Sequence, residues 1–188
     1  MTVGPKSDDN AAIVIAYGSN MPSATALPVR QSASQAFGEV VKTLRNRGLI
    51  VNKISRLWHS LAWPDPAGPP YVNAVLQVQT TLQPFELMAL LHDIEREFGR
   101  VRIGVANAPR AVDLDLISYG QMSLGPGIGL TLPHPRAADR AFVMGPLAEI
   151  LPDWVHPLLQ RTAIDLLGAA TVGRDAYPLA DDAASAGR

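Results

Sequence analysis

Two carboxylates stand two residues apart in a segment that otherwise predicts a buried β-strand. Asp113 and Asp115 are separated only by Leu114 within the run 112–119. Side chains alternate between the two faces of a strand, so both acids would point the same way. Like charges at that spacing repel, and burying either one is costly. The pattern therefore indicates a divalent cation held between the carboxylates, and Arg110 would face an anion bound to that cation.

Arginines gather on both sides of this acidic pair in the sequence. Arg100, Arg102 and Arg110 precede it, and Arg136 and Arg140 follow it. Guanidinium groups bind phosphate oxygens through paired hydrogen bonds, and Mg²⁺ is commonly held by one or two carboxylates together with substrate phosphates. The whole set predicts a site for Mg²⁺ and a polyphosphate. Each arginine alone is better explained as a solvated surface charge, and the acidic pair alone as the polar face of a half-exposed strand.

The composition excludes several other chemistries. The 188 residues are 47% hydrophobic and 18% charged, with a net charge of −1 and no cysteine. Thiolate chemistry is therefore absent, and no global charge favours nucleic acid or an anionic membrane. The sequence has no run of 18 apolar residues, no Gly-x-x-x-x-Gly-Lys-Ser/Thr loop, no Gly-x-Ser-x-Gly elbow and no zinc-type histidine spacing. We expect a cytoplasmic protein whose chemistry lies on Asp, Glu, Arg and His134.

The order of predicted elements indicates how these side chains are positioned. Apolar periodicity and turn residues predict the order β-α-β-β-α-β-β-α. In this order the strands are expected over 11–17, 49–59, 71–80, 101–103 and 112–119, and the helices over 28–47, 83–98 and 136–151. Residues 130–133 are expected to be a short extended piece, and 157–168 could form a last helix. Short connections and alternating strands favour an α+β, ferredoxin-like sandwich, an antiparallel sheet with helices packed mainly on one face. We expect a disordered lead-in over 1–10, a single domain over 11–168 and a disordered tail over 169–188.

The segment 71–80 has the clearest alternation in the chain. Val72, Ala74, Leu76 and Val78 would share the face that packs on helices, which leaves Tyr71 and Asn73 on the face that can meet a ligand or water. The preceding stretch, 61–70, contains four prolines and is expected to be a loop.

These segments together resemble the 6-hydroxymethyl-7,8-dihydropterin pyrophosphokinase family of folate biosynthesis. The resemblance runs from about Ile13 to Trp154, and its central motif is Pro109-Arg110-x-x-Asp113-x-Asp115-Leu116-Ile117. Six matches occur in order; the other five are Gly18-Ser19-Asn20, Tyr71-x-Asn73-Ala74, Ile94-Glu95 with Gly99-Arg100-x-Arg102, Leu132-Pro133-His134-Pro135-Arg136, and Arg140-x-Phe142 with Pro146-Leu147-x-Glu149-Ile150.

The resemblance implies transfer of pyrophosphate from ATP to the hydroxymethyl group of a reduced pterin, which leaves AMP. It implies that Asp113 and Asp115 hold two Mg²⁺ ions and that Arg100 and Arg110 neutralise charge at the attacked phosphorus. The residues that it implies for ATP binding are Glu95, Arg102, Leu116, Thr131, His134 and Arg140. Those that it implies for the pterin are Ser60, Leu61, Tyr71, Asn73 and Phe142, with the two aromatic rings sandwiching the substrate.

Several positions depart from the common family pattern. Asn107-Ala108 stand where Trp-Gly is frequent, and Met21-Pro22-Ser23 follow the opening motif in place of Leu-Gly. A Thr is common at Ser60 and a Gln at His92. None of these changes removes a proposed metal ligand or phosphate-binding arginine.

Two other functions remain open from the sequence. The chain could be a catalytically silent module that binds nucleotide or pterin for regulation, or a kinase that transfers the γ-phosphate. We expect a monomer whose partners are ATP and a reduced pterin, with no nucleic acid and no membrane.

Overall fold

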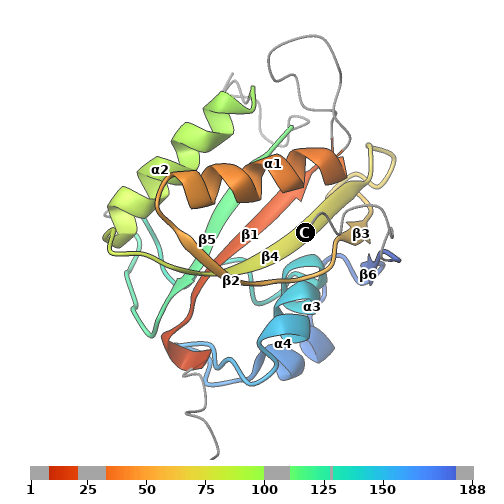
Figure 1. The fold of residues 1–188 in the computed structure, drawn as a ribbon. Coiled ribbons are helices and arrows are strands. Elements are labelled where there is room, and N and C mark those ends of the chain that lie inside the picture. Colours follow the sequence, from red (N-terminus) through yellow and green to blue (C-terminus); the bar gives the residue numbers. More distant parts are fainter. Residues whose placement is uncertain (1–8, 21–32, 100–110, 128, 181–188) are drawn as a thin grey trace, which may run out of the picture.

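An antiparallel sheet forms the centre of the fold (Figure 1). The structure is a computed structural model, and it describes residues 9–20, 33–99, 111–127 and 129–180. The strands are β1 (Ile13–Ser19), β2 (Ile50–Ile54), β3 (Trp58–Ser60), β4 (Tyr71–Gln79), β5 (Asp113–Tyr119) and β6 (Tyr177–Pro178). The helices are α1 (Ala33–Asn46), α2 (Pro84–Glu97), α3 (Ala141–Ile150) and α4 (Ala163–Ala169), after a 3₁₀ turn, η1 (Asp9–Ala11).

The strand order confirms the predicted α+β architecture. The sheet runs β5-β1-β4-β3-β6, β2 also pairs with β4, and every ladder is antiparallel. The order β5-β1-β4-β2, with α1 and α2 as the crossing helices, is the ferredoxin-like arrangement. The single strand expected over 49–59 is divided into β2 and β3. Ser55 lies at the division, where its backbone N–H donates to the Val75 carbonyl and its hydroxyl accepts the Val75 N–H.

Helices α1 and α2 cover one face of the sheet, as the periodicity predicts. Their buried side chains pack against alternate residues of the central strands, among them Ile15 on β1 and Leu76 on β4. The helix residues in this layer recur at three- and four-residue intervals; they include Phe37, Val40, Leu44, Leu87, Leu91 and Ile94.

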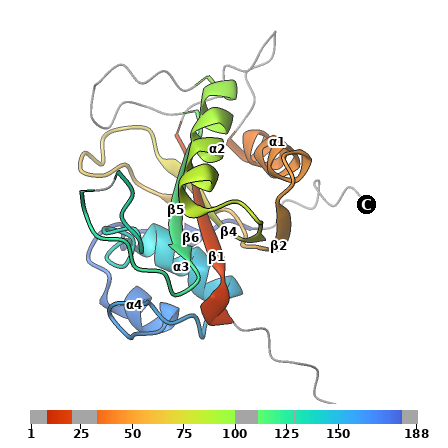
Figure 2. The same cartoon turned by 90° about the vertical axis from the view of Figure 1, so that its left-hand side faces the viewer.

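Helices α3 and α4 cover the opposite face (Figure 2). Val14 and Val75 point to this side and pack against Met144, Leu147 and the fully buried Trp154. This second layer differs from the expectation of helices mainly on one face. We expected the face of β4 that carries Tyr71 and Asn73 to be free to meet a ligand or water, whereas the helical layer covers part of this face and a cavity occupies the remainder. Of the described helices, none is long and apolar enough to cross a bilayer.

The C-terminal segment also differs from the expectation. We expected disorder from residue 169, whereas the structure places residues 169–180 along the domain. β6 pairs with β3, and the N–H of Val172 donates to the carbonyl of Asp139. These bonds join residues far apart in the sequence, so the local Ala/Asp-rich composition gives no indication of them. At the other end, Asn10 accepts the Val155 N–H at 3.1 Å, although it falls within the expected lead-in.

Candidate active site

Three adjacent strands of the sheet, β5, β1 and β4, place the predicted chemical groups around a glycine. Gly18 of β1 stands opposite Asn73 of β4 on one side and Asp113 of β5 on the other. One residue pair further along the same face, Ala16 stands opposite Asp115. Because Gly18 and Ala16 project little or no side chain, the sheet between the acids and Asn73 has an open floor. A Cβ built on Gly18 would lie 3.7 Å from Asn73 Oδ1 and 3.9 Å from Asp113 Cβ.

A cavity of about 100 Å³ stands on this floor. A single water needs roughly 10–15 Å³ on this measure, so the cavity can admit a small organic molecule. Strands β1, β3, β4 and β5, the start of α3 and the loop after β3 all contribute to its lining. The lining residues are Ala16, Tyr17, Gly18, Ser60, Leu61, Trp63, Tyr71, Asn73, Asp113, Asp115, Arg140, Phe142 and Val143.

The acidic wall belongs to β5. Asp113 and Asp115 are half-buried, while Leu114 between them points into the core. Both acids line the cavity, as expected from the two-residue period of a strand. The backbone N–H of Leu114 donates to the buried carboxylate of Glu95 at 2.8 Å, which fastens this part of β5 to α2.

His134 stands beside the acidic wall. Its Nε2 lies 4.0 Å from Asp115 Oδ2, and its backbone N–H donates to the Ile117 carbonyl at 2.8 Å. Burial lowers the pKa of His134 and outweighs the opposing effect of the Asp115 charge; nearby Arg140 and Arg136 lower it further. The imidazole is therefore neutral at pH 7 and places no positive charge beside Asp115.

The opposite wall is aromatic and polar. Tyr71 and Phe142 line the cavity from β4 and α3, and Asn73 lies buried on β4, the strand between β3 and β1. Asn73 Nδ2 donates to Ser60 Oγ at 3.0 Å, which fixes the orientation of the amide. Arg140, the residue before α3, places its guanidinium carbon 5.6 Å from the Phe142 ring centre. That distance is within the range of a cation–π contact.

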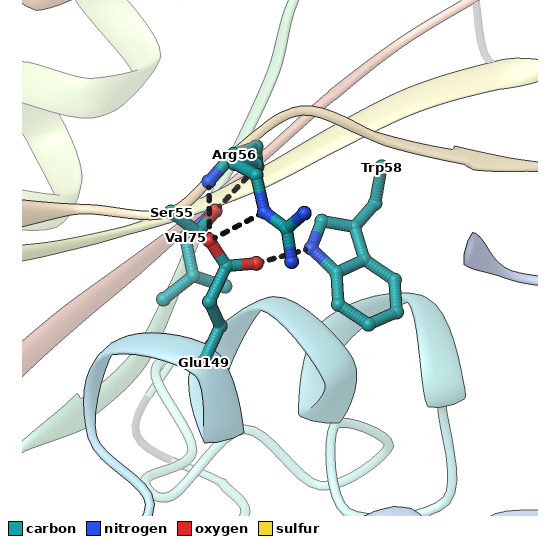
Figure 3. A network of polar contacts seen from close by, with 5 residues as sticks. All are labelled: Ser55, Arg56, Trp58, Val75 and Glu149. Atoms are coloured by element: carbon teal, nitrogen blue, oxygen red, sulfur yellow. Dashed lines mark hydrogen bonds and ion pairs between the residues drawn. The ribbon is translucent and has the colours of Figure 1, made fainter. Parts of the chain in front are cut away.

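Sequence reasoning missed a network of hydrogen bonds that joins α3 to residues 56–58, at the start of β3 (Figure 3). Glu149 of α3 points to the segment before β3, where its Oε1 accepts the backbone N–H and Nε–H of Arg56 at 3.0 and 3.1 Å. Its Oε2 accepts the Trp58 indole N–H at 2.9 Å. Burial raises the pKa of Glu149, but the hydrogen bonds from Arg56 and Trp58 outweigh burial, so the pKa lies below its ordinary value. The Trp58 ring packs so closely on Gly145 that a Cβ there would lie 2.5 Å from it.

The structure brings most, but not all, of the predicted site residues to the cavity. Every predicted pterin residue lines it, as do Asp113, Asp115 and Arg140. Glu95, Leu116, Thr131 and His134 are not among the lining residues, so their nucleotide contacts stay predictions. Arg100, Arg102 and Arg110, like Asn107 and Ala108, lie outside the described residues.

Five lining residues were absent from the predicted set: Ala16, Tyr17, Gly18, Trp63 and Val143. Gly18 belongs to the motif that carried the resemblance, and its place in the floor follows only from the register of three strands. Trp63 lies in the proline-rich loop and is half-exposed. Val143 follows Phe142 at the start of α3. An aromatic residue in a loop beside a predicted site is a signal that could have identified Trp63.

Comparison with known proteins gives one consistent result. The sequence matches the 7,8-dihydro-6-hydroxymethylpterin-pyrophosphokinase (HPPK) family over residues 14–152. It is 39% identical over 140 residues to the 2-amino-4-hydroxy-6-hydroxymethyldihydropteridine pyrophosphokinase of Synechocystis sp., which covers 74% of this chain and 69% of that protein. It is 35% identical over 152 residues to the folic acid synthesis protein fol1 of Pneumocystis carinii, which covers 81% of this chain but only 19% of that longer protein.

Comparison with solved structures also finds a protein with HPPK in its name. A crystal structure of Plasmodium falciparum HPPK-DHPS superposes with a TM-score of 0.64 over 92% of this chain and 48% of that chain, at 11% identity. At that identity the likeness concerns the fold alone. The family match covers most of the chain and includes Asp113, Asp115, Tyr71, Asn73 and Phe142. The chain therefore belongs to the HPPK family, the pyrophosphokinases of folate synthesis.

Proposed function

We propose that this chain transfers the pyrophosphoryl group of ATP to the hydroxymethyl group of 6-hydroxymethyl-7,8-dihydropterin, with AMP as the other product. One observation carries the proposal. A carboxylate wall suited to a metal–phosphate group and an aromatic–amide wall suited to a flat heterocycle face one cavity across Gly18. A hydroxyl carried by the heterocycle would therefore lie beside the phosphates.

The aromatic–amide wall would hold the pterin. Tyr71 and Phe142 offer ring faces for stacking. An amide presents both a donor and acceptors, which suits the mixed edge of a pterin. Asn73 is held in place by Ser60, so it would meet the ring without rearranging. The backbone around Leu61 would complete recognition of the edge.

The carboxylate wall would hold ATP through Mg²⁺, which the family uses. Asp113 and Asp115 fit this ion because they are hard oxygen ligands on one face. The described residues contain no group of three or more His, Asp or Glu side chains placed to hold a metal, so phosphate oxygens and water would complete the coordination. When bound, Mg²⁺ supplies charge neutralisation at the triphosphate and favours ionisation of the pterin hydroxyl. We further propose that two ions bind.

The reaction is an in-line displacement at the β-phosphorus. The pterin oxygen forms a bond to that phosphorus as the bond to the α-phosphate oxygen breaks, so AMP carries away the electron pair and the hydroxyl proton is released. The role of this chain is to position the two substrates and to stabilise the negative charge. Arg140 lies within the cavity and would serve the phosphates. The same role for Arg100 and Arg110, and nucleotide contacts by Arg102 and Thr131, stay predictions.

Incubation of the protein with ATP, Mg²⁺ and the reduced pterin tests the proposal. AMP formed in equal amount to the pterin diphosphate supports it. Formation of ADP would instead identify a γ-phosphate kinase. Binding of both ligands without turnover would identify a silent regulatory module. We also propose that the protein acts as a monomer, and light scattering during size-exclusion chromatography tests this.

A further inference from the structure

The segment 170–180 touches both sides of the pterin slot. It lies beyond residue 152, where the match to the family ends. From α4 it passes the start of α3, crosses to the backbone around Leu61 and ends beside β3. One short segment therefore connects the two structures whose spacing sets the width of the slot.

On the α3 side, the segment is hydrogen-bonded at two consecutive positions, Thr171 and Val172. Thr171 donates its N–H and its hydroxyl to the Asp139 carboxylate at 2.8 Å each. The N–H of Val172 donates to the Asp139 carbonyl at 3.0 Å, and the N–H of Ala141 donates to the Val172 carbonyl at 2.8 Å. These bonds bring Gly173 against the Phe142 ring.

The contact between Gly173 and Phe142 leaves no room for a side chain. Gly173 has a φ of +68°, and a Cβ there would lie 2.4 Å from Phe142 Cδ1 and 3.0 Å from Cε1. Contacts below 3.0 Å require something to move. A side chain at residue 173 would therefore displace either the Phe142 ring or the backbone that carries residue 173.

On the β3 side, the segment holds the backbone that opens the proline-rich loop. Asp175 Oδ2 accepts the Leu61 N–H at 2.5 Å. Tyr177 pairs with His59, and their rings stack with centres 5.0 Å apart. The Leu179 N–H then donates to the Leu57 carbonyl at 2.7 Å. The backbone of residues 57–61 is thereby held from the side away from β4.

We propose that Gly173 and Asp175 are positioning residues for the pterin slot. Gly173 sets the place of Phe142, and Asp175 sets the place of the Leu61 backbone. With both held in the free protein, less of the binding free energy of the pterin is spent on placing the Phe142 ring and the Leu61 backbone. The proposal rests on the proposed function, since it assigns the slot between these walls to the pterin.

Three variants test it: Gly173→Ala, Asp175→Ala and Asp175→Asn. Asp175→Ala removes one charge-assisted hydrogen bond, and we expect the KM for the pterin to rise about two- to tenfold. Asn retains an oxygen acceptor, so Asp175→Asn should restore most of the loss. Gly173→Ala drives a methyl group into the ring, and we expect a rise of about tenfold or more. The KM for ATP should stay within about twofold in all three.

Gly48→Ala is the matched control. Gly48 also has a positive φ, +89°, but a Cβ there meets nothing within 4 Å, and the residue does not line the cavity. It should lower the melting temperature through backbone strain alone and leave both KM values unchanged. If Gly173→Ala lowers the melting temperature like Gly48→Ala and keeps the wild-type pterin KM, the segment is only a structural tether and the proposal is wrong.

The two proposals fail in distinguishable ways. Absence of AMP formation by the wild-type protein would overturn the proposed function. An active wild type whose variants raise the KM values for ATP and pterin equally, or neither, would overturn the positioning role alone. Direct titration of the variants with 6-hydroxymethyl-7,8-dihydropterin gives the same comparison without turnover.

Discussion

Replacement of Glu149 by alanine should cost about 2–4 kcal/mol of unfolding free energy, because its carboxylate accepts three hydrogen bonds between α3 and β3. The bond from the Trp58 indole leaves a half-buried donor unpaired when it is lost, and bonds to a charged partner contribute about 1.5–3 kcal/mol. The two bonds from Arg56 should each contribute less free energy, since the Arg56 side chain is 46% exposed. For a chain of this length, we expect the melting temperature to fall by roughly 5–15 °C.

A double-mutant cycle isolates the indole bond. Trp58→Phe removes the indole N–H together with the part of the ring that packs on Gly145, so it should cost more than about 1 kcal/mol by itself. In Glu149→Ala, the same change should cost about 1 kcal/mol less, because the packing loss is common to both backgrounds, and this difference is the coupling energy of the indole bond. Urea or guanidinium unfolding followed by circular dichroism measures all four proteins. A loss below about 0.5 kcal/mol for Glu149→Ala, or full additivity with Trp58→Phe, would refute this account of the network.

The pH dependence supplies an independent check on Glu149. The pKa of its carboxyl is lower in the folded protein than its ordinary value of 4.5. The unfolded chain therefore binds a proton more readily, and the stabilisation is present above pH 4.5 and lost as the pH falls through the folded pKa. The difference in unfolding free energy between wild type and Glu149→Gln should be constant near neutrality and shrink below about pH 4.5.

Three further predictions concern the site and the pH response. Asp115→Asn should reduce AMP formation about a thousandfold or more while the melting temperature without Mg²⁺ changes little; a large thermal loss would mean that the acidic pair is structural. Tyr71→Ala should raise the KM for the pterin about tenfold or more and the KM for ATP less than about threefold, and equal effects would disprove the slot assignment. Burial lowers the pKa of His156, whose Nδ1 accepts the N–H groups of Leu158 and Leu159. The unfolded state therefore binds more protons below pH 6.5, and the unfolding free energy should decrease as the pH falls from about 7 to 5. His156→Gln should flatten that slope, and an unchanged slope would remove His156 as its cause.

Local periodicity predicted much of the fold because one layer of it is built from regular alternation. Leu87, Leu91 and Ile94 recur at helical spacing and are fully buried. The two-residue period of β4 placed Tyr71 and Asn73 on the face that lines the cavity. In these elements the same residue pattern specifies both the local structure and the side that it buries.

The contacts between distant segments could not be predicted in this way. Trp58 and Glu149 are 91 residues apart, and nothing in either neighbourhood identifies the other as its partner. The ordered path of residues 169–180 could not be predicted for the same reason, because it depends on hydrogen bonds to Asp139 and Leu61, which are distant in the sequence. An Ala/Asp-rich composition reports only that a segment cannot form a core of its own, and here the segment is ordered by hydrogen bonds to surfaces that already exist.

The second face of the sheet explains how a small domain accommodates both a core and a reaction site. Along β1, the side chains that point to this face are Val14, Ala16 and then Gly18, so they become smaller toward one end of the strand. At the Val14 end, α3 and α4 pack closely on the sheet. At the Gly18 end the same face is hollow, and the acids of β5 and the aromatic residues of β4 and α3 surround the space. The sheet is rigid at the site because it is packed at the other end, so the walls can be held apart without substrate. Preorganisation of this kind is what an in-line transfer between two bound molecules requires.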